Sequence, residues 1–302
     1  MNDIDIYIPV FNNIFCVEYQ IKTLKAFSRH NPTNIFIVDN NMEFHPDNSE
    51  KVKKICEENQ VHYIFNDDPI IRQMRKIEGK WSSLQHGRTF NFLFHNIIRE
   101  RKPTYFGFLD ADCFAVRPFD FSKYLEEKNV YGKVVPTHVD ENQHRTFSGD
   151  YAWNIHVVCN FFKFSTVSEK QLDFMAGGDR LLKRLGVRLD TGGMNYEFLY
   201  KDLDKREYVL PEEHYYYYDN LKLLDPNLDK PTNVLYEIID ETWFHMVHSP
   251  AGKEENLYMN PKISYAKGFL DCAMLNYGVA GAKVREDFIP TYRDPNRHYT
   301  FN

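Results

Sequence analysis

Short apolar runs alternate with helical segments over the first 110 residues, and this alternation constrains the fold more than any other feature. A run with apolar residues at every second position starts at Ile4, a helical pattern starts at Ile14, and the strand N-I-F-I-V-D-N follows a break at N-P-T. A charged helix capped by Asp47 or Ser49, the strand V-H-Y-I-F, a helix over residues 82–101 and the strand T-Y-F-G-F-L-D continue the series. Four strands alternating with three helices predict an α/β fold whose central sheet is mostly parallel and flanked by helices, as in Rossmann-like proteins.

The later part of the chain is less regular. Strand patterns appear in V-Y-G-K-V-V-P-T, W-N-I-H-V-V-C-N-F-F-K-F, E-H-Y-Y-Y-Y-D-N and V-L-Y-E-I-I, with helices in between. We expect an irregular, helical C-terminal extension, with a helix over residues 264–277 and an irregular end. Pro9 further predicts that the last residues of the first strand leave the sheet ladder.

Composition excludes several classes of function. The formal net charge of -6 and pI near 6.1 provide no basic field for nucleic acid, so no nucleic-acid partner is expected. No targeting leader and no transmembrane segment are predicted, and a cytoplasmic location is expected, while contact with a membrane surface is left open. The five cysteines are scattered without CxxC spacing, which favours ordinary reduced thiols.

Acidic residues end three of the predicted strands. Asp39 follows the second strand, Asp67 and Asp68 the third, and Asp110 and Asp112 the fourth. Parallel sheets bind ligands at the carboxyl ends of their strands. Two carboxylates at i and i+2 can share one divalent cation, since hard oxygen ligands suit Mg²⁺ or Mn²⁺, although aspartate is also common where a loop starts.

Three segments together resemble a known enzyme family. D-I-Y-I-P-V-F-N-N, F-I-V-D-N-N and F-L-D-A-D, in this order and at these spacings, are similar to the nucleotide-sugar half of a GT-A glycosyltransferase of the family 2 type. The similarity covers about the first 120 residues, with H-G-R-T-F-N standing where such enzymes have a helix that touches the nucleotide. The usual V-D-N-G-S loop and the E-D and Q-x-x-R-W signatures are missing.

The resemblance implies roles for individual residues. It implies that residues 9–11 (Pro9, Val10 and Phe11) line the base and ribose site and that Asp39 accepts a hydrogen bond from the base. Asp110 would lie nearer the ribose, and Asp112 would bind a Mn²⁺ or Mg²⁺ ion held by the diphosphate. The small Ala111 would leave room for the donor against the backbone. His86 and Arg88 would approach the diphosphate, although an exposed arginine on a helix is the commoner case.

A second cluster, W-F-H-M-V-H-S-P-A-G-K, offers a further metal ligand. His245 and His248 would share a face in a helix and point oppositely in a strand, so at most one need be a ligand. His248 is the preferred ligand because S-P-A-G-K follows it, a turn in which Lys253 could bind phosphate oxygens. The alternative is that both histidines are structural.

An inverting transfer also needs a carboxylate that accepts the acceptor's proton. Asp190 ends an apolar run before Gly-Gly and is the first candidate, and Asp179 is the second, although both residues fit helix caps. The tyrosines at 215–218 and the residues Trp153 and Trp243 could stack on sugars, but core packing is the commoner role for such aromatics.

The hypothesis is a metal-dependent glycosyltransferase that uses a UDP or GDP type of nucleoside-diphosphate sugar and a glycan or lipid-linked hydroxyl acceptor. Similarity to family 2 favours inversion, and the H-x-x-x-G-K ending keeps retention open. We expect residues 1–120 to form a donor half, 121–260 an acceptor half and 261–302 an extension. The alternatives are a sugar-1-phosphate nucleotidyltransferase, whose Gly-rich first loop is absent here, and a non-catalytic carbohydrate-binding protein of the same fold.

Overall fold

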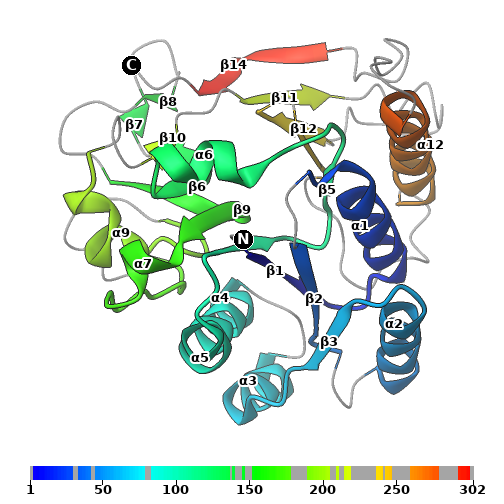
Figure 1. The fold of residues 1–302 in the computed structure, drawn as a ribbon, viewed down its shortest axis with the longest axis horizontal. Coiled ribbons are helices and arrows are strands. Elements are labelled where there is room, and N and C mark those ends of the chain that lie inside the picture. The colour runs from blue at the N-terminus through cyan, green and yellow to red at the C-terminus, as the bar shows by residue number, and fades with distance from the viewer. Residues whose placement is uncertain are drawn as a thin grey trace.

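A seven-stranded sheet with the order β10-β6-β9-β4-β1-β2-β3 forms the centre of the molecule (Figure 1). The computed structural model describes residues 3–29, 33–41, 45–78, 83–136, 138–139, 145–146, 152–177, 189–204, 209–210, 214–218, 236–240, 242–246, 259–278 and 292–299. The strands of the sheet are β1 (Ile4–Val10), β2 (Thr33–Asp39), β3 (His62–Phe65), β4 (Tyr105–Leu109), β6 (Val130–Pro136), β9 (Trp153–Lys163) and β10 (Val209–Leu210). Only β9 among them runs antiparallel to its neighbours, so the predicted mostly parallel α/β sheet is confirmed.

Helices cover both faces of this sheet. The ribbon places α1, α2 and α12 on one side and α3, α4 and α5 on the other (Figure 1). The helices are α1 (Ile14–Phe27), α2 (Pro46–Glu58), α3 (Pro69–Glu78), α4 (Ser83–Phe92), the π-helical η2 (Leu93–Ile98), α5 (Arg99–Arg101), α6 (Phe121–Glu127), α7 (Phe164–Val167), α9 (Asn195–Phe198), the 3-10 turn η3 (Tyr200–Asp202) and α12 (Met259–Gly278).

The central strand β1 is buried along its whole length because helices pack on both of its faces. Ile6 and Ile8 join the core that contains α1 and α2, whereas Tyr7 joins the core that contains Phe90 of α4. The alternation of side chains along a strand therefore divides β1 between two hydrophobic cores.

A second, antiparallel sheet has the order β14-β11-β12-β13-β5. Its strands are β5 (Cys113–Ala115), β11 (His214–Tyr218), β12 (Tyr236–Ile239), β13 (Trp243–His245) and β14 (Tyr292–Tyr299). A short hairpin, β7 (His138–Val139) with β8 (Arg145–Thr146), completes the described strands. The strand β5 begins only four residues after β4 ends, so the two sheets are joined at residues 110–112.

Several local predictions are wrong. The helix α3 was not predicted, whereas the helix predicted over 82–101 is confirmed by the consecutive segments α4, η2 and α5. The helix α2 begins at Pro46, so Asp47 lies in its first turn instead of capping it. Pro9 stays in register with Val38 of β2, although pairing with β4 ends at Tyr7. Residues 292–299, predicted as irregular, form β14, which lies at the edge of its sheet, where a proline is tolerated.

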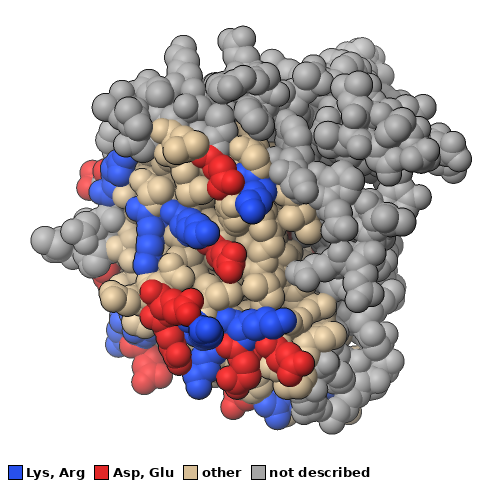
Figure 2. Space-filling view, turned by 90° about the vertical axis from the view of Figure 1, so that its right-hand side faces the viewer, with Lys and Arg blue, Asp and Glu red and all other residues tan. Residues whose placement is uncertain are grey.

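Acidic and basic side chains are interleaved on the face that is shown in Figure 2, over the part that the structure describes. The helix α2 carries an exposed ion pair, Lys54 with Glu58, one turn apart and 3.7 Å from each other. None of the described helices is both long enough and apolar enough to cross a bilayer.

Candidate functional site

The turn D-A-D lies where the two sheets meet. Asp110 follows β4 directly, and its carbonyl accepts a hydrogen bond from the Cys113 N–H at 3.0 Å, which closes a tight turn into β5. The Asp110 N–H donates to the Val158 carbonyl of β9 at 3.1 Å. Because β1 continues to β2 on one side while β4 lies on its other side, this turn is located at the topological switch point of the sheet, where ligands of such folds bind.

A buried glutamine of α1 is hydrogen-bonded to the backbone of the turn. The Gln20 amide donates to the carbonyl of Asp110 at 3.2 Å and to that of Cys113 at 2.6 Å. The side chain of Gln20 is fully buried, so both bonds lie in an environment of low dielectric constant. The backbone that carries Asp110 and Asp112 is therefore fixed to α1.

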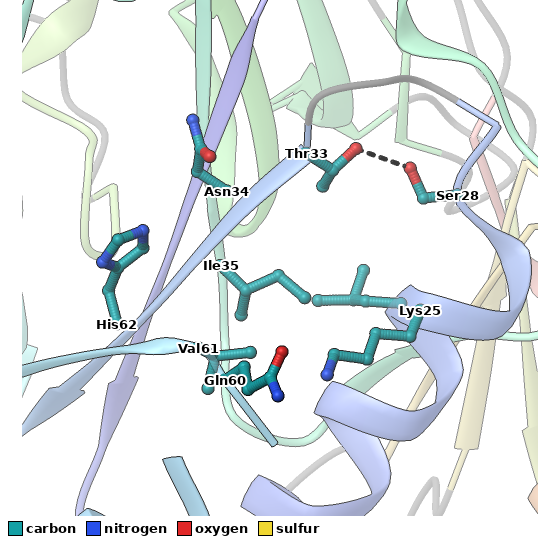
Figure 3. Close-up of a pocket in the computed structure, with 9 residues that line it drawn as sticks. Lys25, Ser28, Thr33, Asn34, Ile35, Gln60, Val61 and His62 are labelled. Atoms are coloured by element: carbon teal, nitrogen blue, oxygen red, sulfur yellow. Dashed lines mark hydrogen bonds between the residues drawn. The ribbon is translucent and has the colours of Figure 1, made fainter. Parts of the chain in front are cut away.

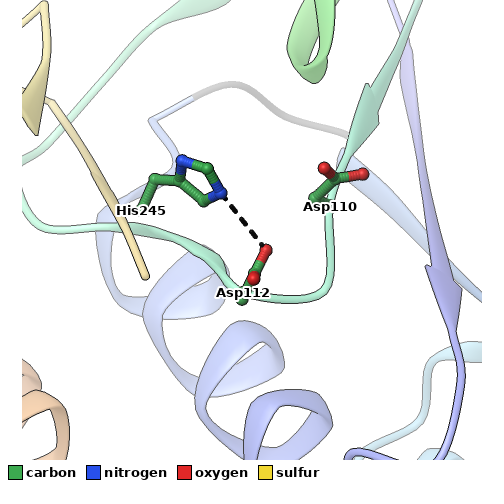
Figure 4. A group of neighbouring side chains, drawn as sticks. All are labelled: Asp110, Asp112 and His245. Atoms are coloured by element: carbon green, nitrogen blue, oxygen red, sulfur yellow. Dashed lines mark ion pairs between the residues drawn. The ribbon is translucent and has the colours of Figure 1, made fainter. Parts of the chain in front are cut away.

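His245 reaches Asp112 through strand pairing. β13 pairs with β5, which places His245 opposite Cys113, and the Met246 N–H donates to the Asp112 carbonyl at 2.9 Å. The His245 Nε2 atom lies 3.6 Å from Asp112 Oδ1, and Figure 4 shows this pair beside Asp110. His245 lies in a strand, Trp243–His245, whereas His248 lies outside the described residues.

Asp110, Asp112 and His245 together have the composition and spacing of a divalent-metal site. One ligand atom from each of them lies within 4.8 Å of the others. Opposite ligands of an ion such as Mg²⁺ are about 4.2 Å apart, so a small closure would bring these three atoms to bonding distance. Two carboxylates and an imidazole suit Mn²⁺ as well as Mg²⁺, and the residues therefore fit the predicted ion.

His86 pairs with the other carboxylate of the turn. Its Nε2 lies 3.1 Å from Asp110 Oδ1, and its ring packs on Phe90 with the centroids 4.6 Å apart. Burial alone would lower the pKa of His86, but the charge and hydrogen bond of Asp110 and the charges of Asp112 and Asp190 raise it above its usual value. Burial alone would raise the pKa of Asp110, but His86 and two more distant histidines lower it.

Gly87 allows α4 to approach the loop that leads towards Asp190. A Cβ atom at this position would lie 2.6 Å from the Phe174 carbonyl oxygen and 3.0 Å from the Met175 Cα atom. Phe174 in turn accepts a hydrogen bond from the Gly192 N–H at 2.7 Å. The glycine in H-G-R-T-F-N thus has a structural explanation that brings helix α4 and residues 189–194 together.

Asp190 interacts electrostatically with two histidines near the D-A-D turn. Its charge acts on His86 and on His156, and its carboxylate accepts a hydrogen bond from the Thr191 N–H at 2.7 Å. Desolvation raises the pKa of Asp190, but the charge of His156 and hydrogen bonds from Thr191 and Ser83 lower it below its usual value. Asp190 is exposed and ionised at neutral pH, as a base must be.

The residues expected to line a base site lie at the ends of β1 and β2. Val10 and Phe11 are buried, and the Phe11 ring meets that of His45 at 5.5 Å. Asp39 is fully buried, with one oxygen accepting from the Tyr63 hydroxyl and the other from the Asn41 N–H, both at 2.8 Å. A role of Asp39 in base recognition remains a prediction.

Polar side chains also lie at the carboxyl ends of β2 and β3. The Asn66 amide donates to Asn40 at 2.7 Å and to Thr89 of α4 at 3.3 Å. Arg88 of the same helix donates from Nε to Asp68 Oδ2 at 2.9 Å. Arg88 is thus directed to the end of β3, so an interaction with a diphosphate also remains a prediction.

The remaining sequence-based candidates divide into two groups. Asp179, His248 and Lys253 lie outside the described residues. Trp153 and Trp243 are buried in the two cores, which confirms core packing as their role. Gln20 and His156 were not among the predicted residues, and no motif marks either of them. His248 was preferred to His245 because S-P-A-G-K follows it, whereas the structure places His245 beside Asp112.

A separate pocket of about 280 Å³ lies at the opposite edge of the sheet (Figure 3). Its lining includes Lys25 and Ser28 near the end of α1, Thr33 at the start of β2 and His62 at the start of β3. No carboxylate lines it, so the acidic cluster and this pocket are different sites.

Comparisons with known proteins give matches at the level of structure. No protein-family model matches the sequence, and no curated protein matches it. The mannosyltransferase PcManGT from Pyrobaculum calidifontis, in complex with GDP-Man and Mn²⁺, aligns with a TM-score of 0.33 and 11% identity over 61% of this chain and 46% of its own. The mannosyltransferase Ktr4p from S. cerevisiae aligns with a TM-score of 0.32 and 16% identity over 47% of this chain and 41% of its own. This chain therefore matches less than half of either enzyme's length.

Proposed function

We propose that this protein is a metal-dependent glycosyltransferase with a GT-A fold, which moves a sugar from a nucleoside-diphosphate sugar to a hydroxyl acceptor. The observation that carries the proposal is the D-A-D turn at the switch point, where Asp110 and Asp112 gather with His245. A phosphate that binds at the carboxyl ends of the strands needs positive charge or hydrogen-bond donors there. Two carboxylates repel a diphosphate, so this cluster attracts one only when a cation is bound to it.

The residues divide the work by their position. Asp112 and His245 would hold the ion together with Asp110, and Gln20 keeps the turn in place. When bound, the ion supplies positive charge that stabilises the nucleoside diphosphate as it leaves. His86 orients Asp110, and the residues at the ends of β1 and β2 would receive the base and ribose.

Asp190 is the proposed base. It is exposed and ionised at neutral pH, and its negative charge acts on both His86 and His156. An ionised carboxylate on the acceptor side can accept the proton of an attacking hydroxyl, which favours inversion. In this proposal residues 1–120 hold the donor and residues 121–260 the acceptor, a glycan or a lipid-linked sugar.

Ligand binding and variants test the proposal. Thermal unfolding would be measured with UDP, GDP, UDP-glucose and GDP-mannose, each with and without Mn²⁺. A true donor at 100 times its Kd should stabilise the folded state by about 2.7 kcal/mol, and only with the ion present. Transfer or slow hydrolysis of that donor would then be followed by release of the nucleoside diphosphate.

Asp112→Asn is the decisive variant. It removes a charged ligand while keeping the size of the side chain, so we expect Mn²⁺ affinity and turnover to fall by at least about tenfold. Asp67→Asn is the matched control, because Asp67 is an exposed aspartate at the end of β3. Normal metal-dependent turnover by Asp112→Asn would refute the proposal.

A further inference from the structure

His156 lies in an unusual part of β9. The register between β6 and β9 passes from Gly132 opposite Asn160 to Val134 opposite Ile155, so that Lys133 alone faces four residues of β9, 156–159. A Cβ atom at Gly132 would lie 2.2 Å from the Cys159 carbonyl oxygen, so β6 can follow this bulge only with a glycine. Bulges of this kind redirect side chains and are frequent beside active sites.

A hydrogen bond within the bulge determines which ring nitrogen of His156 carries the proton. The Val158 N–H donates to His156 Nδ1 at 3.2 Å, and the Val158 carbonyl accepts from the Asp110 N–H at 3.1 Å. One residue, Val158, therefore connects His156 to the D-A-D turn through its backbone N–H and carbonyl groups. Since Nδ1 is an acceptor, the proton of the neutral ring is on Nε2.

The Nε2–H group is available to a ligand. The side chain is partly exposed, and no group in the described part of the chain accepts a hydrogen bond from Nε2. Burial, followed by the charge of Lys133, lowers the pKa of His156 to about 4, so the ring is neutral at physiological pH. The charges of Asp190 and Asp110 act on the ring in the opposite direction and favour its protonated form.

We propose that His156 binds the sugar that is transferred, by donating a hydrogen bond from Nε2–H to one of its hydroxyl oxygens. This inference rests on the proposed function, in which Asp110 is on the diphosphate side of the sugar and Asp190 on the acceptor side. The neutral imidazole carries no charge that would attract a phosphate, and its electrostatic neighbours are one lysine, Lys133, and two carboxylates. A hydroxyl group can accept from the imidazole and donate to a carboxylate. The group that fits this position is therefore a hydroxyl group, as a sugar supplies.

Two substitutions at His156 test the Nε2–H donor separately from the hydrogen bond that Nδ1 accepts from Val158. His156→Asn keeps an acceptor for the Val158 N–H, because an asparagine oxygen bonds the N–H two residues on, but its side chain ends short of the Nε2 position. His156→Gln places an amide N–H near that position and loses the local acceptor. His95→Asn is the control, since His95 bonds Leu172 and lies on η2, away from the D-A-D turn.

The experiment measures, for each variant, the Kd of the donor found by the ligand panel and the Kd of its nucleoside diphosphate, both with Mn²⁺. We expect His156→Asn to weaken binding of the nucleotide sugar about fivefold while leaving the nucleoside diphosphate unchanged, the size expected for one hydrogen bond. His156→Gln should keep more of the preference for the sugar than His156→Asn, and His95→Asn should keep all of it. Circular dichroism would verify that each variant is folded.

The outcomes distinguish this inference from the proposed function. If His156→Asn keeps the wild-type preference for the sugar, or weakens both ligands equally, His156 does not bind the sugar. If the wild-type protein binds no nucleotide sugar in preference to its nucleoside diphosphate, the proposed function fails and this inference fails with it.

Discussion

At the scale of residues, the site is a set of paired histidines and aspartates. Each carboxylate of the D-A-D turn has its own imidazole, His86 for Asp110 and His245 for Asp112. His156 differs from both because its ring is bonded to its own strand. The three imidazoles therefore have different surroundings, and the first two are oriented by carboxylates while the third is oriented by the backbone.

The depressed pKa of His156 gives a pH dependence of stability. In the folded state this group resists protonation until about pH 4, whereas in the unfolded chain it binds a proton below about 6.5. Its contribution to stability is therefore complete above 6.5 and is lost as the pH falls towards 4. In buffer without divalent cations, we expect the free energy of unfolding to fall less steeply over this pH range in His156→Asn than in the wild-type protein.

Denaturant unfolding at several pH values between 4 and 7 would measure this difference. Other groups titrate in the same range, but they are common to both proteins and cancel in the comparison. Parallel curves for the two proteins would show that His156 is protonated equally in the folded and unfolded states.

At the scale of elements, contacts between segments that are distant in sequence build the site. The helix α4 reaches residues 174–175 at Gly87, and α1 reaches the D-A-D turn through Gln20. In both cases one side chain, or the lack of one, determines how closely two elements approach. Such positions affect the geometry of the site without touching a ligand.

Gly87→Ala tests this at the approach of α4. The added methyl would overlap backbone atoms of Phe174 and Met175, which cannot rotate away, so we expect a loss of about 1–3 kcal/mol in the free energy of unfolding. The shift of α4 should also move His86 and reduce donor affinity. Leu84→Ala is a suitable control, because Leu84 is an exposed residue of the same helix. Unchanged stability of Gly87→Ala, measured by denaturant unfolding, would contradict the packing described here.

Elements with strong periodicity could be predicted from the sequence, and short ones could not. Ile14 to Phe27 and Ile4 to Val10 carry clear helical and alternating patterns, and both elements formed as expected. β5 and β13 have only three residues each, and they pair although 127 residues separate Ala115 from Trp243. A contact of this kind leaves no local signal. Asp110 and Asp112 could be predicted as partners from their spacing, whereas nothing in the sequence paired His245 with them.

At the scale of the whole molecule, the metal cluster depends on how the second sheet packs on the first. Trp243 of β13 is fully buried and lies against Phe121 of α6 and Phe161 of β9, with ring centroids 6.0 and 5.8 Å apart. Its Nε1–H donates to the Tyr131 hydroxyl of β6 at 3.1 Å. Trp243 lies two residues before His245 on β13, a strand of the second sheet. Its side chain is therefore embedded in the core of the seven-stranded sheet.

Trp243→Ala should weaken both stability and metal binding. Removing this side chain is expected to cost about 3–5 kcal/mol of the free energy of unfolding. Displacement of β13 should raise the Kd for Mn²⁺ by about tenfold or more, although Asp110, Asp112 and His245 are all retained. Isothermal titration under conditions in which the variant is folded would measure the metal affinity.

Phe162→Ala provides the matched comparison. Phe162 is equally buried but belongs to the core on the other face of the main sheet. It should lose a similar amount of stability with little change in the Kd for Mn²⁺. An equal loss of metal affinity in both variants would indicate a general loosening of the protein, and Trp243 would then have no special place in the cluster.

Because the two sheets meet at the D-A-D turn, the residues of the cluster are synthesised at different times. Asp112 precedes His245 by 133 residues, and ribosomes add about 5–20 residues per second. A nascent chain therefore carries both aspartates for roughly 7–27 s before their histidine is synthesised. During that interval the parallel strands can assemble with an incomplete acidic cluster. In the proposed function, the growing polypeptide would acquire full affinity for the ion only after its second sheet has formed.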